Sequence, residues 1–385
     1  MVHYNGKGVF ILGVGIAPFG KQEETPLENI GAIAINNAID DAQIEPEQIQ
    51  AAFCAHSYGG RVAGQRAMKE AGISGIKVIN CENACSGGAT AFHLAYQSVV
   101  SGQNDLVLAI GMDKMSGGLI TLPETDYEAA AGKTLPSKYA LRAVRYMHQY
   151  GMSEKELALV SLKNRGNGVF NPKAHFQKAI TLDEIMSAKL ISYPFTLPQC
   201  CPNSDGAAAI IIGSKKWLPA CKHPAVEVCA SVVCSGKYQN PVTANPSPDD
   251  EITVRTATKA FQMAGCTPKD IDVAEVHDAF TIGEVLAYEN IGLCGRGESR
   301  NLLLEGRTQL DGDIPVNPSG GLISRGHPLG ATGACQLAEI TLQLREQAGA
   351  HQIKKRPRLG LTHCTGGSTP LIGTAACSIH ILGTC

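Results

Sequence analysis

The chain has 385 residues, 42 of them glycine, with a formal net charge of −2 and 5% aromatic residues. A charge this close to zero argues against nucleic acid or an anionic membrane surface as a partner. Frequent glycine and scarce aromatic residues are typical of a tightly packed α/β protein and unlike a disordered chain. The length is enough for two domains or for one large doubled domain.

Strands and helices are predicted to alternate over the first 115 residues. The apolar runs 9–14 and 106–110 favour strands that are buried on both faces of a sheet. The last strand of this half is predicted to come late in the chain, at 205–212. The other expected elements are helices near 27–42 and 64–71, strands at 51–56 and 77–80, and a helix after Cys85.

A segment from 116 to 199 interrupts this half and has a helical pattern at 139–150 and 153–165. It is locally basic, with ten lysines and arginines against seven acidic residues over 119–200. A solvated surface insertion would have this composition, and so would a cap that forms a pocket for a phosphate-bearing ligand. For a cap, the candidate ligand-binding residues are Lys133, Lys138, Arg142, Arg145, Lys163 and Arg165.

The second half of the chain returns to the strand–helix–strand order from about residue 225. Its elements are expected at 272–277, at 285–292, after His327, at 357–361 and at 372–381. The predicted parts are a first half at 1–115 with 200–220, an insertion at 116–199 and a second half at 221–385.

Two pairs of segments read as copies of each other. Cys85-Ser-Gly-Gly-Ala-Thr90 matches His327-Pro-Leu-Gly-Ala-Thr332, so a cysteine in one copy takes the place of a histidine in the other. Segments 42–49 and 264–271 also match, and each is followed by a short apolar strand that ends in a histidine, His56 or His277. Repeats in a fixed order indicate a doubled fold, which would bring Cys85 and His327 to one centre.

Cys85 is predicted to lie at the N-terminus of a helix. The positive helix end and its unpaired N–H groups should lower the pKa of a thiol there. The glycines that follow allow a substrate carbonyl to approach the backbone, and the N–H of Cys85 can face an oxyanion. A small apolar residue in a tight turn is the alternative interpretation.

His327 lies in a loop with five glycines between Gly320 and Gly333. A histidine in such a loop is suited to act as a base toward a thiol or as a donor to a bound carbonyl. The segments His277-Asp-Ala-Phe280 and Thr362–Ser368 each follow a strand, and the second would present Cys364 in a loop. Two cysteines in separate environments allow separate tasks, acylation and proton transfer.

The remaining sequence signals concern location and metals. No segment is long enough to cross a membrane and no signal peptide is evident, so we expect a cytoplasmic protein. The fourteen cysteines are expected to be reduced, and none has the paired spacing of a zinc site, so no metal is predicted.

The motifs together resemble a thiolase, in the subgroup with an HDxF motif that includes the thiolase domain of sterol carrier protein X and the archaeal acetoacetyl-CoA thiolases. The resemblance covers essentially the full length and is densest at Cys85, 277–280, 317–333 and 364–366. It implies a thiolase fold, with two similar βαβαβαββ halves layered α-β-α-β-α and a helical insertion. The usual pattern of the sterol-carrier type has a cysteine where this chain has Ala279.

The resemblance also implies roles for individual residues. Cys85 would be the nucleophile, His327 would activate it, and Cys364 would be a second acid and base. His277 and His327 would form one oxyanion hole, and the N–H groups of Cys85 and Gly366 the other.

The implied activity is thiolysis of a 3-oxoacyl-CoA, or the reverse Claisen condensation, with coenzyme A as a substrate and no permanent cofactor. A retro-aldolase, a non-catalytic acyl-CoA or lipid-binding protein, and a subunit that acts with a small zinc-binding OB-fold partner are the alternatives. A homodimer is expected, paired through strand 77–81.

Overall fold

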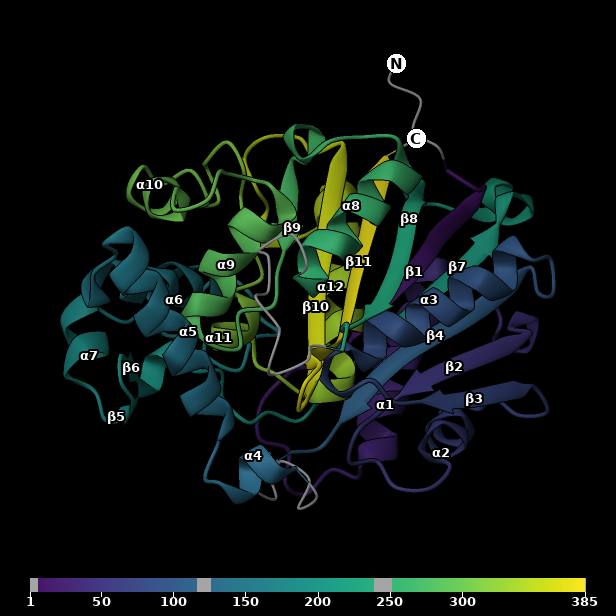
Figure 1. Cartoon of the computed structure of the whole chain (residues 1–385). Helices are drawn as coiled ribbons and strands as arrows, with labels where there is room; N and C mark the ends of the chain where they lie inside the picture. The colour runs from purple at the N-terminus through teal and green to yellow at the C-terminus, as the bar shows by residue number, and fades with distance from the viewer. Residues whose placement is uncertain (1–5, 116–125, 239–250, 385) are drawn as a thin grey trace.

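The computed structural model describes residues 6–115, 126–238 and 251–384, and nine of its strands form one mixed sheet, while β5 (Leu190–Ser192) and β6 (Phe195–Thr196) form a small separate one (Figure 1). The first half contributes β1 (Val9–Ile16), β2 (Ala51–Ala55), β3 (Lys77–Cys81), β4 (Leu106–Asp113) and β7 (Gly206–Ser214). The second half contributes β8 (Val226–Ser235), β9 (Val273–Glu275), β10 (Leu359–Thr369) and β11 (Gly373–Thr384).

The strand order confirms the predicted duplication. It reads β3-β2-β4-β7-β1 in the first half and β9-β10-β11-β8 in the second, which is the same order without a counterpart of β3. A single parallel bridge between Ala274 and Val316 stands in that place. In both halves the second-last strand of this order is antiparallel to both of its neighbours. This strand is β7 in the first half and β11 in the second. Within the described sheet, the two halves join through two residue pairs between β1 and β8.

The helices also repeat. The helices α1 (Leu27–Ala42) and α8 (Ile252–Ala264) are each followed by a short 3₁₀ turn, at Pro46–Gln48 and Pro268–Asp270. The two 3₁₀ turns lie in the segments 42–49 and 264–271, whose sequences match, and both turns have a capping box. The helices that follow the Cys85 and His327 segments are α3 (Gly87–Val100) and α12 (Leu329–Leu344).

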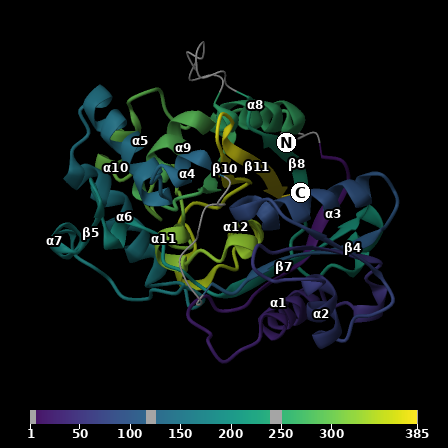
Figure 2. The same cartoon turned by 60° about the horizontal axis from the view of Figure 1, so that its bottom comes forward.

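The buried side chains define a layered arrangement. One face of the first-half strands packs on α1 and on α2 (Ala63–Glu70). Alternate residues of the same strands, such as Phe53 and Ile210, point the other way, onto α3 and α12. The strands of the second half pack on α8 and on α9 (Thr281–Ile291). Helices α3 and α12 therefore form the central layer, as Figure 2 shows.

Glycine allows the two central helices to touch. A Cβ on Gly88 would lie 2.5 Å from the carbonyl oxygen of Gly330, and one on Gly333 would lie 2.6 Å from the backbone nitrogen of Ala89. Both distances are far below van der Waals contact, so larger residues would force the helices apart. This close crossing brings the N-terminal ends of α3 and α12 together.

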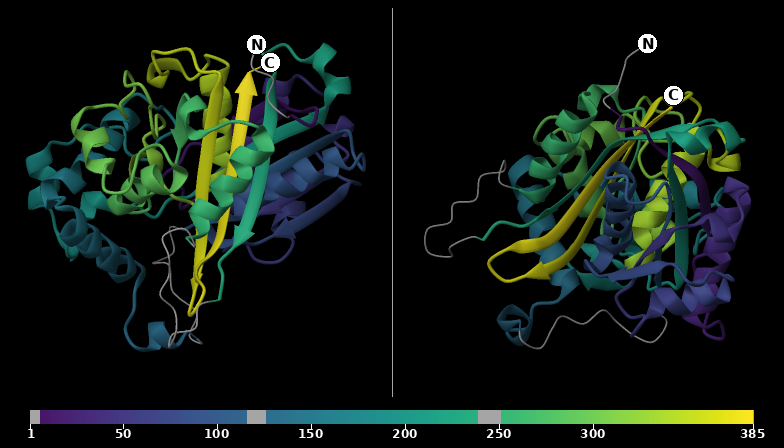
Figure 3. Two further views of the ribbon diagram at one scale, coloured as in Figure 1. Left: turned by 45° about the horizontal axis from the view of Figure 1, so that its top comes forward. Right: turned by 90° about the vertical axis from the view of Figure 1, so that its right-hand side faces the viewer.

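The insertion forms a separate helical layer beside the second half (Figures 1 and 3). Thr134 and Ser153 begin two of its helices with capping boxes, and Gly151, with a φ of 70°, ends the first. Residues 116–125 of the predicted insertion lie outside the described residues, and the predicted part boundaries stay predictions. The elements of the layer are α4 (Tyr127–Ala130), α5 (Leu135–Tyr150), α6 (Glu154–Gly168), α7 (Leu182–Ser187), β5 (Leu190–Ser192) and β6 (Phe195–Thr196).

Two short helices lie between α9 and α12 in the chain. They are α10 (Ser299–Leu304) and α11 (Gly321–Arg325). No helix in the described ranges is both long and apolar enough to cross a lipid bilayer. The structure corrects one prediction: the segment from Thr362 to Ser368 belongs to β10 and is not a loop after it. A glycine-rich sequence suggested a loop, but β11 pairs with β10 from Thr362 to Gly366 and again at Ser368.

Candidate active site

Cys85 lies in a sharp turn between β3 and α3. Ala84 before it has a left-handed backbone with a φ of 47°, which turns the chain abruptly from strand to helix. A Cβ on Gly366 of β10 would lie 2.1 Å from the carbonyl oxygen of Asn83 in this turn. Glycine at 366 therefore lets β10 of the second half approach the backbone that holds Cys85.

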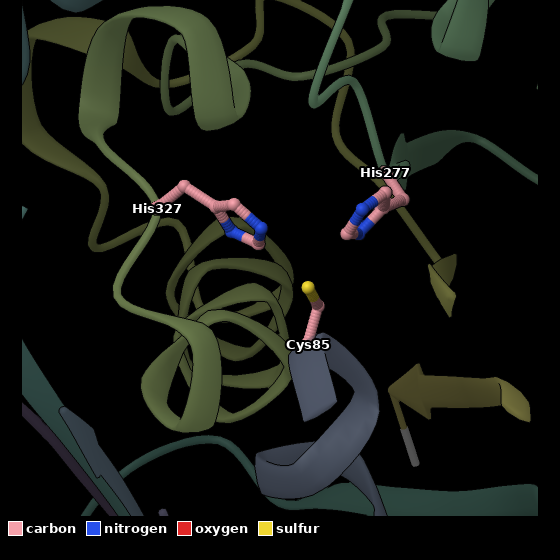
Figure 4. A group of neighbouring side chains, drawn as sticks. All are labelled: Cys85, His277 and His327. Carbon is pink, nitrogen blue, oxygen red and sulfur yellow. The ribbon is translucent and has the colours of Figure 1, made fainter. Parts of the chain in front are cut away.

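Three side chains meet at this turn (Figure 4). The sulfur of Cys85 and one ring nitrogen each of His277 and His327 all lie within 4.8 Å of one another. His277 comes from the loop after β9 and His327 from the loop before α12, and both are buried. The ring centroids of the two histidines are 5.2 Å apart, with an edge-on orientation. The predicted convergence of Cys85, His277 and His327 is confirmed as geometry.

The charge state of these groups differs from the expectation. Burial raises the pKa of Cys85 to about 12, although hydrogen bonds from the backbone of Cys85 and Gly367 act in the opposite direction. Burial lowers the pKa of His327 to about 3, and burial with the neighbouring His327 lowers that of His277 well below its usual value. The expected lowering of the Cys85 pKa was wrong, because loss of water outweighs the helix end. At neutral pH the cluster is a thiol and two neutral imidazoles.

Cys364 contacts the same cluster from within β10. Its sulfur lies 3.0 Å from the carbonyl oxygen of Cys85 and 3.5 Å from Nδ1 of His277. The side chain is almost fully buried, and burial raises its pKa well above the usual value. Both thiols and both histidines predicted from the sequence therefore lie in one cluster. For Gly366, the structure shows the close backbone approach, whereas its role in an oxyanion hole stays a prediction.

Asp113, at the end of β4, connects this site across the two halves. Its carboxylate accepts hydrogen bonds from the N–H groups of Ser57, Tyr58 and Gly330, the last at 2.6 Å. It thereby holds the first turn of α12, three residues after His327. Burial raises its pKa to about 6. Asp113 was not among the predicted site residues; an acidic residue at the end of a fully apolar strand is the signal that could have indicated it.

The other residues of the HDxF motif support the loop of His277. Asp278 accepts hydrogen bonds from the Leu322 N–H at 2.7 Å and from Asn164 Nδ2 at 2.7 Å, so it joins this loop to α11 and α6. Phe280 stacks on Tyr139 of α5 with a centroid distance of 4.7 Å. The motif therefore anchors the loop to the insertion.

A cavity of about 370 Å³ opens between the insertion and the second half. His277 and His363 line it, as do Tyr139, Arg142 and Arg145 of α5. One cavity is therefore lined both by His277 of the three-residue cluster and by arginine side chains of α5.

The structure divides the six basic candidates of the insertion. Arg142 and Arg145 line the cavity, and Lys133 and Lys138 line a shallower pocket beside α4. Lys163 is unsuited to a surface ligand, because its side chain is buried and pairs with Glu284 at 2.9 Å. The Arg165 guanidinium lies 4.0 Å from the centre of the Phe176 ring.

The cluster of Cys85, His277 and His327 is also the one group in the described ranges with the side chains and spacing of a metal site. Cysteine and histidine are zinc ligands, so three ligands are available here. The prediction that this protein binds no metal therefore needs a direct measurement of metal content in the purified protein.

Comparison with known proteins agrees with this geometry. The family model "Thiolase, N-terminal domain" matches residues 9–189, and "Thiolase C-terminal domain-like" matches 237–383. The chain therefore belongs to the thiolase family, as the motifs predicted.

Relatives align over nearly the whole chain. The benzoylsuccinyl-CoA thiolase subunit BbsB of Thauera aromatica is 37% identical and aligns over 93% of this chain and 94% of its own length. An acetyl-CoA acetyltransferase of Methanothermobacter thermautotrophicus is also 37% identical, with coverage of 97% and 99%. Sterol carrier protein 2 of Gallus gallus is 34% identical, with coverage of 97% and 72%.

A solved structure described as "Ltp2-ChsH2(DUF35) aldolase" has the same fold, with a TM-score of 0.82, 23% identity and 98% coverage of both chains.

Proposed function

We propose that this protein is a coenzyme A-dependent acyltransferase that cleaves a 3-oxoacyl-CoA with CoA, or runs the reverse condensation, through an acyl group on Cys85. The observation that carries the proposal is the cluster of one thiol and two neutral imidazoles where the two halves meet. A neutral imidazole can take the proton of a half-buried thiol during attack, which a protonated imidazole could not.

In the cleavage direction, His327 accepts the Cys85 proton while the sulfur attacks the 3-keto carbon. The bond between C2 and C3 breaks, the acyl group stays on Cys85, and the CoA-bound fragment leaves as an enolate. Cys364 donates its proton to the enolate carbon and regains one from His327. The thiol of the incoming CoA then loses its proton to the enzyme and removes the acyl group, which restores Cys85.

Neutral histidines also suit the stabilisation of the enolate. An N–H group of His277, beside His327, can donate to the thioester oxygen as negative charge develops there. The N–H groups of Cys85 and Gly366 are the proposed donors for the oxygen on the acylated carbon.

The direct test is mass spectrometry after incubation with an acyl-CoA. The acyl adduct is expected on the peptide that contains Cys85, and Cys85→Ala is expected to abolish both the adduct and turnover. An adduct on another cysteine, with continued turnover by Cys85→Ala, would contradict the proposal.

We further propose that Arg142 and Arg145 hold the CoA phosphates. Both line the cavity that reaches His277. Exchanging both for glutamate should raise KM for CoA substrates about tenfold, since each exposed charge contributes up to about 1 kcal/mol. A short pantetheine thioester should react almost normally. The matched control is Lys155→Glu with Lys178→Glu, which changes the same charge at exposed sites of the insertion; equal losses for both substrates would indicate a role in acyl-chain binding instead.

A second candidate is a subunit that acts with a separate protein. It is favoured by the relative named as a thiolase subunit and by the structural neighbour whose title names two components. Thiolysis of a panel of short, branched and aromatic 3-oxoacyl-CoAs, with and without proteins encoded beside this one, separates the two. Activity only after addition of a zinc-binding OB-fold protein would support the subunit.

A further inference from the structure

The hydroxyl group of Thr332 lies against the catalytic histidine. Thr332 is fully buried in the first turn of α12, five residues after His327. Its Oγ1 lies 2.7 Å from Nδ1 of His327 and 2.9 Å from the carbonyl oxygen of Pro328. Both distances are those of good hydrogen bonds, and the hydroxyl has one hydrogen to share between them.

The two partners differ in what they can do. The carbonyl oxygen of Pro328 can only accept, so the hydroxyl hydrogen satisfies that contact, and Oγ1 is left to accept from Nδ1–H. His327 then has its proton on Nδ1, and the lone pair on Nε2 is available to a neighbour.

The duplicated half contains the same arrangement with an unambiguous donor. Thr90 occupies the matching position in α3, and its Oγ1 lies 3.0 Å from the carbonyl oxygen of Ser86. There Oγ1 accepts from the amide Nδ2 of Asn83, also at 3.0 Å, and an amide NH₂ group can only donate. In both halves a threonine hydroxyl donates to the carbonyl four residues back and lies against a side chain from the turn before the helix, Asn83 in one half and His327 in the other.

We propose that Thr332 is a positioning residue that holds His327 in the Nδ1–H tautomer, so that Nε2 is the base that takes the proton of Cys85. The proton moves from sulfur to Nε2, and the resulting imidazolium keeps its Nδ1–H bond to Thr332. The kinetic part of this inference rests on the proposed function, whereas the tautomer itself does not.

The chain offers a closely matched control on the same helix. Thr341 is also fully buried in α12 and donates to a carbonyl one turn back, that of Leu337, at 2.8 Å. No histidine of the described ranges is bonded to it. Thr332→Val and Thr341→Val therefore remove the same intrahelical hydrogen bond, but only the first removes the acceptor for His327.

The first measurement is nitrogen NMR of ¹⁵N-histidine-labelled protein, with His327 assigned from its loss in His327→Gln. The wild type and Thr341→Val are expected to carry the proton on Nδ1, whereas Thr332→Val should show a mixture or the other tautomer. A proton on Nε2 in the wild type would overturn the proposal, whatever reaction the protein catalyses.

The second measurement is the rate of Cys85 alkylation by iodoacetamide together with thiolase kinetics. Thr332→Val should lower the alkylation rate and kcat about tenfold or more with little change in KM, because loss of the group that fixes the tautomer of a catalytic histidine lowers kcat strongly. Thr341→Val should stay near the wild type, and Thr332→Ser should restore the rates. Equal effects at 332 and 341, at equal melting temperatures, would show that Thr332 is only structural. Absence of thiolase activity in a wild type that retains the tautomer and the alkylation pattern would refute the proposed function alone.

Discussion

At the scale of single residues, the candidate site works with neutral groups. The pKa of Cys85 is raised to about 12 and that of His327 is lowered to about 3, so thiol and imidazole coexist over the whole range between. A cysteine activated by a helix end would instead be partly ionised at neutral pH. In the proposed reaction, proton transfer from Cys85 would therefore accompany attack and not precede it.

This predicts how Cys85 titrates. Because the folded thiol holds its proton well above the ordinary pKa of about 8.5, no Cys85 thiolate should form between about pH 5 and about pH 10. The measurement is ultraviolet thiolate absorbance of the wild type minus that of Cys85→Ser. A step near pH 8.5 in the difference would contradict the neutral thiol.

Cys364 leads to a separate prediction. Its sulfur contacts both the Cys85 backbone and His277, which suits proton transfer and not acylation. Cys364→Ala should still accept an acyl group from a simple acyl-CoA, while cleavage of 3-oxoacyl-CoA falls by about 10²- to 10⁴-fold, the usual size of a general acid–base contribution. Stopped-flow acylation and steady-state thiolysis measure the two reactions. If both were unchanged, Cys364 would have only a packing role.

At the scale of elements, the crossing of α3 and α12 positions the chemistry. Cys85 and His327 lie just before the first turns of these helices, and the two backbones touch at Gly88 and Gly330. A methyl group at either position has no free space, so the crossing tolerates only glycine there.

We expect Gly88→Ala to destabilise the protein by about 1–3 kcal/mol, since overpacking forces backbone shifts. Activity should fall as well, because the same shift separates Cys85 from His327. The control is Gly166→Ala in α6, where an added Cβ meets nothing within 4 Å; it should be neutral or stabilise by up to about 1 kcal/mol. Denaturant unfolding of both variants compares them, and equal effects would argue against a tight helix crossing.

At the scale of the whole molecule, β3 is an edge strand of the described sheet, as the sequence analysis predicted. Ile79 in this strand is 41% exposed, and an open apolar edge is a site for pairing with another chain. We expect two copies to pair through β3, directly before the Cys85 turn.

Light scattering should therefore give a mass of at least twice 40.6 kDa. Ile79→Lys should weaken the assembly, whereas Leu141→Lys on the exposed face of α5 should not, although Leu141 is the more exposed. A monomer at micromolar concentration in the wild type would refute the dimer, whereas larger assemblies would not.

The sequence by itself determined the duplication, the order of the main elements and the four reactive side chains. It did so because the two halves keep matching local signals, such as the Cys85 and His327 segments and the turns after α1 and α8. The buried strands and capped helices also follow from local patterns.

Only the tertiary structure decided the charge of the site, because a pKa depends on the amount of water that the surrounding protein excludes. It also showed that Cys364 lies within a strand, that Lys163 is buried, and that Asp113 and Thr332 contact the segment that holds His327. These contacts join residues from both halves or depend on the exact turn of α12. The residues next to them in the sequence therefore do not indicate that the contacts form.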